Sequence, residues 1–117
     1  MGSRRPGSSA PERRPRVEFL WWEECPSWER VLARLRETMA ELGLDPDSIE
    51  LRRIDTEADA AATSFAGSPT IRVDGADVQS PGDAPIGLSC RIYRRRDGSV
   101  SPLPDPADVR DALVAAL

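Results

Sequence analysis

The feature that most constrains the fold is a strand-like run of residues followed directly by a long amphipathic helix. Residues 17–22 are β-branched, aromatic or aliphatic except for Glu18, which predicts a strand buried on both faces. Pro26 is expected to begin a helix and Gly43 to end it. Between them, apolar residues recur at helical steps: Trp28, Leu32, Leu35, Met39 and Leu42. Residues 49–54 read as a second strand. This order predicts a right-handed crossover between parallel strands.

The second half of the chain alternates turn signals with short strand-like segments. An Ala-rich stretch, residues 57–65, predicts a short helix that Asp55 or Thr56 caps and Gly67 ends. A strand at 71–73 and the hairpin signal at 74–75 return the chain through 76–78. A loop at 79–89, a strand at 90–94, a turn at 97–98 and a helix from 105 follow. The chain is therefore predicted to be an α/β domain with a mixed parallel and antiparallel sheet flanked by helices.

The first 16 residues differ in composition from the rest. They are rich in Pro, Gly, Ser and Arg without apolar periodicity, so we expect residues 1–16 to form a disordered arm and residues 17–117 the domain. The chain has a net charge of −4, and five of its 16 basic residues lie in this arm, so the domain itself is more acidic. An acidic domain is a poor partner for nucleic acid, because phosphate neutralisation supplies most of that affinity.

Two residue types are missing, and their absence excludes several kinds of chemistry. There is no His and all basic residues are Arg, which removes His-dependent triads, Cys-His dyads, His metal ligands and Schiff-base lysines. No cofactor or metal is implied. No apolar run is long enough to span a bilayer, so we expect a cytoplasmic protein without a membrane partner. In such a reducing compartment, the two cysteines are expected to be thiols rather than a structural disulfide.

Cys25 is the first candidate for chemistry, since it stands at the expected start of the long helix. Unpaired N–H groups and the positive end of the helix dipole stabilise a thiolate there. Trp22 and Trp28 flank it in Trp-Glu-Glu-Cys-Pro-Ser-Trp, and Pro26 follows it. We therefore expect a reactive thiol beside aromatic rings, although the carboxylates of Glu23 and Glu24 would oppose its ionisation by like-charge repulsion.

A strand, then Trp-x-x-Cys-Pro-Ser-Trp at a helix start, and later Gly-Ser-Pro-Thr before the next hairpin resemble the thioredoxin-like superfamily over residues 17–117. The resemblance implies that Pro69 is cis and packs beside Cys25, with Ser68 and Thr70 next to it. It also implies that the backbone just before this proline can pair with an extended substrate peptide. The implied activity is thiol-disulfide exchange with a protein or a low-molecular-weight thiol or disulfide.

The sequence departs from this family at one informative position. Members that shuttle disulfides carry a second cysteine three residues after the first, where this chain has Trp28. Cys90 is the alternative resolving thiol, provided that its Cα lies within about 7 Å of that of Cys25. The turn signals allow two arrangements: Cys90 either returns to the Cys25 end of the sheet or is a structural thiol at the far end.

Three functions remain open at this point. The first is an oxidoreductase with Cys25 as nucleophile and Cys90 as the candidate resolving thiol. The second is a redox-inactive binding module that holds a partner or a small molecule through Trp22, Trp28 and Pro69. The third is soft-metal or organomercurial chemistry by two converging thiolates, Cys25 and Cys90. The substrate, the reductant and the oligomeric state are not indicated.

Overall fold

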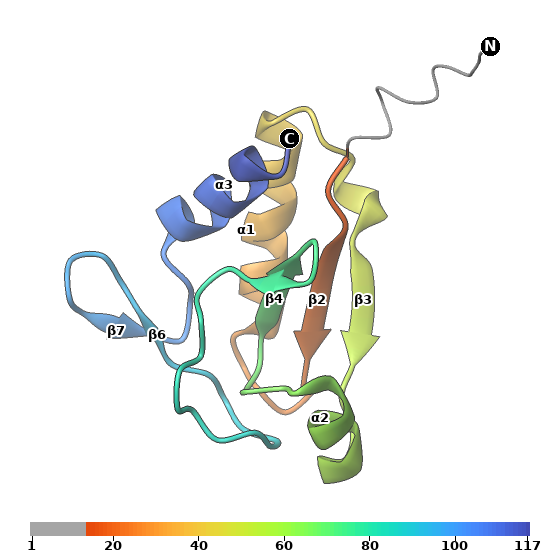
Figure 1. Cartoon of the computed structure of the whole chain (residues 1–117), viewed down its shortest axis with the longest axis vertical. Helices are drawn as coiled ribbons and strands as arrows, with labels where there is room; N and C mark the ends of the chain where they lie inside the picture. Colours follow the sequence, from red (N-terminus) through yellow and green to blue (C-terminus); the bar gives the residue numbers. More distant parts are fainter. Residues whose placement is uncertain (1–13) are drawn as a thin grey trace.

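The computed structural model describes residues 14–117, which form a mixed sheet with helices around it (Figure 1). The strands of the main sheet are β2 (Val17–Trp21), β3 (Glu50–Arg53), β4 (Thr70–Val73) and β5 (Ala76–Asp77). The helices are α1 (Trp28–Glu41), the 3-10 turn η2 (Pro46–Ser48), α2 (Glu57–Thr63) and α3 (Pro106–Ala115). A separate hairpin consists of β6 (Tyr93–Arg94) and β7 (Val100–Ser101).

The central strand is β2, in the sheet order β3-β2-β4-β5. Phe19 of β2 lies opposite Leu51 of the parallel strand β3 and opposite Ile71 of the antiparallel strand β4. The turn at 74–75, with both residues at positive φ, joins β4 to the antiparallel strand β5. The predicted parallel crossover, the antiparallel hairpin and the mixed sheet are therefore confirmed.

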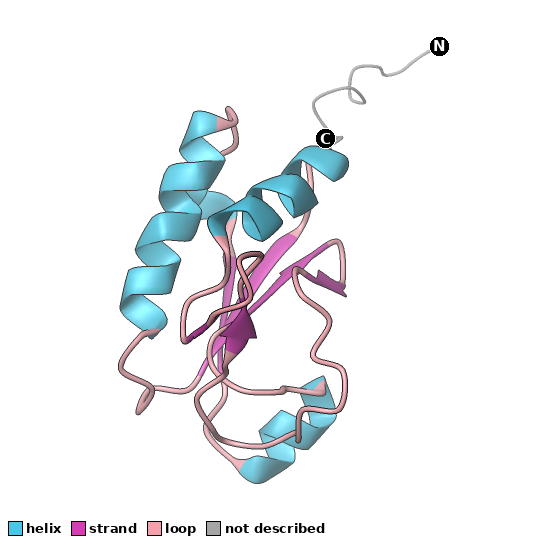
Figure 2. Cartoon of the chain, turned by 90° about the vertical axis from the view of Figure 1, so that its left-hand side faces the viewer, coloured by secondary structure: helices cyan, strands magenta, loops and turns pink. Residues whose placement is uncertain are grey.

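Side chains alternate along β2 and so divide the core into two clusters. Val17 and Phe19 face the larger cluster, which α1 and α3 complete with residues such as Leu35 and Leu113. Leu20 faces the smaller cluster, with Ile54, Ala60 of α2 and Phe65. In Figure 2, α1 and α3 accordingly lie together and α2 lies apart, at the end of the sheet where β2 and β3 finish.

Two predicted helix boundaries were wrong. In both cases, turn residues next to the helix were predicted as part of the helix. Helix α1 begins at Trp28, not at Pro26, because Pro26 and Ser27 belong to a turn, and the Ser27 carbonyl accepts the first helical bond from Val31 at 3.1 Å. Helix α2 ends at Thr63, because Ser64 takes the left-handed conformation (φ 54°) ahead of Gly67.

The predicted strand over 90–94 was also wrong in extent. Only β6 is a strand there, and it pairs with β7 away from the main sheet. Arg96 ties this hairpin to α3 through ion pairs with Asp108 and Asp111, both at 2.8 Å. Cys90 itself makes a single isolated bridge to Ser68, which becomes important for the site.

Arg16 connects the predicted arm to the domain. Its backbone N–H donates to Asp74 Oδ1 at 2.8 Å, and its guanidinium pairs with Glu50 at 2.8 Å. Arg16 therefore packs with the domain although composition groups it with the arm. Residues 1–13, the remainder of the predicted arm apart from residues 14 and 15, lie outside the described residues.

Among residues 14–117, no helix combines the length and the apolar character needed to cross a lipid bilayer.

Candidate functional site

Cys25 lies in the turn that links β2 to α1. Its N–H donates to the Trp22 carbonyl at 3.1 Å, which closes the turn, and only 1% of the residue is exposed. The thiol therefore stands three residues before the first helical residue rather than on the helix itself. The N-terminal end of α1 still contacts the thiol, because Ser27, the N-cap residue of α1, lies next to the Cys25 sulfur.

Hydrogen bonds around the Cys25 sulfur decide its ionisation. Cys25 Sγ lies 3.3 Å from Ser27 Oγ and 3.3 Å from the Ser68 carbonyl oxygen. Burial raises the pKa of Cys25, but the Ser27 hydroxyl and backbone N–H, with smaller contributions from Cys90 and Ser68, outweigh burial and lower this pKa below its ordinary value. Sequence reasoning missed the role of Ser27, although a hydroxyl two residues after a cysteine in a turn is the signal that would have found it.

The residues around Pro69 form the second part of the site, next to the turn that contains Cys25. The Ser68-Pro69 peptide bond is cis, as the resemblance implied, and Ser68 and Thr70 are both fully buried. Ser68 Oγ accepts a hydrogen bond from the Trp22 N–H at 2.9 Å, so it joins the residue after β2 to the segment around Pro69. Thr70 Oγ1 donates to the Gly67 carbonyl at 2.7 Å. The predicted neighbours Ser68, Pro69 and Trp22 are thus brought together with Cys25.

Cys90 lies at the same end of the sheet as Cys25, which decides between the two arrangements that the sequence left open. The Ser68 N–H donates to the Ser89 carbonyl at 2.8 Å, and the Arg91 N–H donates to the Ser68 carbonyl at 2.8 Å. Both thiols are free and are not at disulfide distance; Cys90 is exposed whereas Cys25 is buried. Partial burial, and then the neighbouring Cys25, raise the pKa of Cys90.

Arg91 holds the segment of Cys90 in place, and the sequence did not predict it. Its guanidinium is buried, with the residue 4% exposed, and pairs with both carboxylate oxygens of Asp77 at 2.7 and 3.1 Å. It also donates to Thr70 Oγ1 at 3.2 Å and to the Gln79 carbonyl, and lies 4.4 Å from the centre of the Tyr93 ring. Asp77 of β5 is therefore the ion-pair partner that holds this guanidinium.

Gly67 allows two backbones to approach each other beside this ion pair. Its φ is +113°, a conformation that side chains rarely adopt, and a Cβ there would lie 3.0 Å from the Arg91 Cα. The segment of residues 89–91, here called the Cys90 segment, therefore packs directly on the chain that precedes the cis proline.

Other predicted site residues lie elsewhere. The ring of Trp28 packs on that of Trp21, with centroids 5.2 Å apart, and both partly buried rings pack against the larger core cluster. Pro26 is exposed in the turn. Glu23 is exposed and pairs with Arg53. The structure thus gives Trp28 a packing role, whereas sequence proximity placed it beside the thiol.

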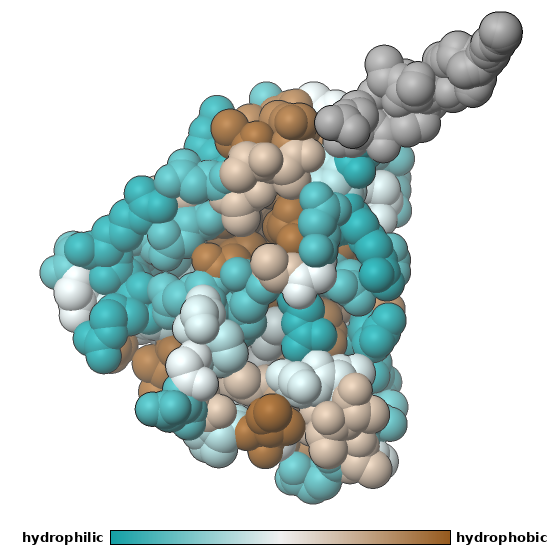
Figure 3. Space-filling model, viewed as in Figure 1, coloured by the Kyte–Doolittle hydropathy of each residue, from teal (hydrophilic) through white to brown (hydrophobic). Residues whose placement is uncertain are grey.

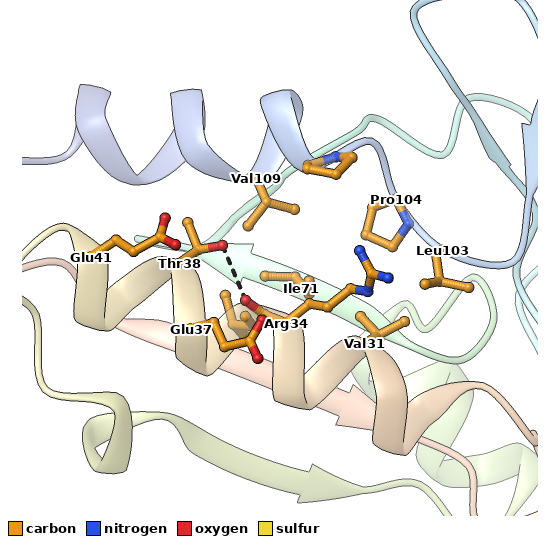
Figure 4. Close-up of a pocket in the computed structure, with 11 residues that line it drawn as sticks. Val31, Arg34, Glu37, Thr38, Glu41, Ile71, Leu103, Pro104 and Val109 are labelled. Carbon is orange, nitrogen blue, oxygen red and sulfur yellow. Dashed lines mark hydrogen bonds between the residues drawn. The ribbon is translucent and has the colours of Figure 1, made fainter.

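Two hollows are relevant to binding. A pocket of about 220 Å³ lies between α1 and α3, where Val31, Ile71 and Val109 line it and Arg34 extends toward Pro104 (Figure 4). It contains none of the predicted site residues. A second hollow, of about 360 Å³, is lined by Cys90 itself together with Ala66, Ile92 and residues of the 79–85 loop.

The comparisons with known proteins found no match: no family model, no curated protein and no solved structure resembles the chain closely enough to be matched. Within the described part of the chain, no three His, Cys, Asp or Glu side chains gather as a metal site would require. The site is therefore interpreted from its own geometry.

The lowered pKa of Cys25 gives a prediction that can be tested in the variant Cys90→Ser. We expect its thiolate, followed by ultraviolet absorbance, to form at a lower pH in the folded than in the unfolded protein, because the Ser27 donors remain. Because the pKa of Cys25 is lower in the folded than in the unfolded protein, the free energy of unfolding should rise as pH increases from the folded to the unfolded pKa. The same stabilisation should be lost when pH is lowered through the folded pKa. Adding Ser27→Ala should move the folded midpoint upward; an unchanged midpoint would contradict the assigned cause.

Proposed function

We propose that the protein is a thioredoxin-like thiol-disulfide oxidoreductase that cycles between two free thiols and a Cys25–Cys90 disulfide. The observation that carries this proposal is the bridge between Ser68 and Cys90, which brings an exposed thiol next to a buried, ionisable one. A cysteine that is distant in sequence thereby supplies the second thiol that is missing at position 28.

Three features support the thioredoxin-like part of the proposal. Cys25 follows the central strand and precedes a long helix, the peptide bond before Pro69 is cis, and the carbonyl of Ser68 lies 3.3 Å from the Cys25 sulfur. These are the relations that the sequence resemblance implied. These three features concern the position of the Cys25 thiol, whereas the proposed disulfide exchange follows from the reactivity of the thiol itself.

Cys25 is suited to be the nucleophile that closes the internal disulfide. A thiolate attacks a disulfide sulfur, and the hydrogen bonds from Ser27 favour that ionised form by lowering the pKa of Cys25. When Cys25 attacks a mixed disulfide on Cys90, the S–S bond to the substrate breaks and the substrate leaves as a thiolate. Two electrons pass from the protein to the substrate, and a reducing compartment such as the cytoplasm would return them.

The test is an equilibrium titration in buffers of defined thiol-to-disulfide ratio, followed by rapid alkylation, intact mass and peptide mapping. We expect wild type to lose two hydrogens in one cooperative step, with a single peptide pair linking Cys25 to Cys90. Cys25→Ser and Cys90→Ser should each lose this step while keeping the far-ultraviolet circular dichroism of the wild type.

The opposite result has a definite meaning. If the intact mass shows that wild type keeps both thiols reduced at every ratio, the oxidoreductase proposal fails. The domain would then be a redox-inactive binding module that uses the surface around Trp22, because Pro69 is fully buried.

A further inference from the structure

The Cys90 segment forms hydrogen bonds with the backbone groups beside Cys25. Ser68 is the residue whose carbonyl contacts the Cys25 sulfur, and both its N–H and its C=O are bonded to the Cys90 segment at 2.8 Å. An extended polypeptide that approached Cys25 by adding a strand would need these same groups free. The chain's own segment therefore stands where such a strand would bind.

This segment is held firmly. Arg91 is buried and makes contacts with Asp77, Thr70 and the Gln79 carbonyl, and Tyr93 reaches back to donate to the Pro69 carbonyl. Displacing the segment would break these contacts, including the ion pair between the buried Arg91 and the partly buried Asp77, which is costly. A substrate that must lift this segment to reach Cys25 is thus at a disadvantage.

The two thiols also differ in solvent exposure, and this difference favours Cys90. Cys25 is 1% exposed, whereas Cys90 is exposed and borders the hollow of about 360 Å³. The 79–92 loop around it also exposes Ile86 and Ile92, at 52% and 70%. Figure 3 shows small apolar patches in brown on the lower part of this face, where Figure 1 places that loop. A small molecule can reach Cys90 without any movement of the backbone.

We propose that Cys90 is the thiol that exchanges with substrate, that the substrates are low-molecular-weight disulfides, and that the Cys90 segment excludes extended polypeptides from Cys25. This inference rests on the proposed function and assigns the order of its steps.

The steps balance as follows. The Cys90 thiolate attacks one sulfur of a small disulfide, whose S–S bond breaks, and the first thiolate leaves and takes up a proton. The Cys25 thiolate then attacks Cys90 Sγ, the second substrate thiolate leaves, and it too is protonated. Two protein thiols are oxidised to one disulfide and one small disulfide is reduced to two thiols. In the reverse direction, Cys25 is the better leaving group, because a thiol of lower pKa leaves faster.

The experiment traps the first adduct with hydroxyethyl disulfide as the probe. In wild type quenched with acid at early times, the mixed disulfide should map to Cys90. Cys25→Ser should accumulate this adduct at the wild-type rate, whereas Cys90→Ser should form an adduct on Cys25 at least about 100-fold more slowly, because native Cys25 must wait for local opening. Circular dichroism confirms that both variants are folded.

A second arm tests the substrate class with an unstructured peptide that contains one disulfide. Wild type should reduce it no faster than it reduces hydroxyethyl disulfide. In Cys90→Ser, the further change Asp77→Asn weakens the hold on the segment and should increase the reactivity of Cys25, whereas Asp83→Asn, in the exposed 79–92 loop, should not.

The failures are distinguishable. An early adduct on Cys25, or rapid reaction of Cys25 in Cys90→Ser, overturns the assignment of Cys90 while the redox titration of wild type still succeeds. Faster reduction of the peptide overturns the substrate class. If wild type shows no internal disulfide in that titration, the proposed function fails, and this inference fails with it.

Discussion

Replacing Asp77 by alanine is expected to lower the free energy of unfolding by about 3–5 kcal/mol. The side chains of Arg91 and Asp77 are 4% and 14% exposed, and their closest N–O distance is 2.7 Å. Without the carboxylate, the Arg91 guanidinium stays buried with only neutral partners, and desolvation of an unpaired charge is the dominant cost. Urea unfolding measures the change.

Two further variants separate the ion pair from general loop effects. Asp83→Ala, exposed in the neighbouring loop, should change the unfolding free energy by no more than about 0.5 kcal/mol. The double variant Asp77→Leu with Arg91→Met should recover much of the loss, because it buries no unpaired charge. A loss below about 1 kcal/mol in Asp77→Ala would mean that Arg91 reaches solvent, and the Cys90 segment would then not be held as proposed.

Phe65→Ala is expected to cost about 3–5 kcal/mol. Phe65 is fully buried in the smaller cluster with Leu20, Ile54 and Ala60, and a cluster of this size cannot refill the space of a lost ring. Its carbonyl also accepts the Gly87 N–H at 3.0 Å, so the residue links α2 to the loop before Cys90. The measurement is again urea unfolding, with thermal unfolding as a second probe.

The controls for Phe65 use size and position. Phe65→Leu should cost less than about 1.5 kcal/mol, because most of the apolar volume remains. Val114→Ala, at a side of α3 where Val114 is 48% exposed, should stay within about 0.5 kcal/mol. Equal losses for Phe65→Ala and Val114→Ala would show that the smaller cluster is not a separate part of the core.

Much of the fold could be predicted from local patterns. The run at 17–22, the apolar periodicity that ends at Gly43 and the turn at 74–75 depend on residues a few positions apart, and β2, α1 and the β4–β5 hairpin are found there. The errors are local too. Pro26 is a common first helical residue and an equally common turn residue, and only the structure, in which α1 begins at Trp28, shows that it belongs to a turn.

The candidate site could be predicted only in part. That Cys25, Ser68 and Pro69 are neighbours was implied by the resemblance to the thioredoxin-like superfamily, which the motifs around Cys25 and Pro69 carry. Trp28 was predicted beside the thiol, yet a residue one helical turn further on can point to another face, and its ring packs on Trp21.

The sequence by itself therefore determined the order of strands and helices, the parallel crossover and the presence of a thiol at the end of the central strand. Only the tertiary structure decided that Cys90 lies at the Cys25 end, that Arg91 and Asp77 hold it there, and that Cys25 is buried while Cys90 is exposed. The physical reason is the range of the interactions. Periodicity and turn chemistry act over a few residues, whereas a buried ion pair across 14 residues and a backbone bridge between Ser68 and Cys90 form only once the sheet brings distant segments together.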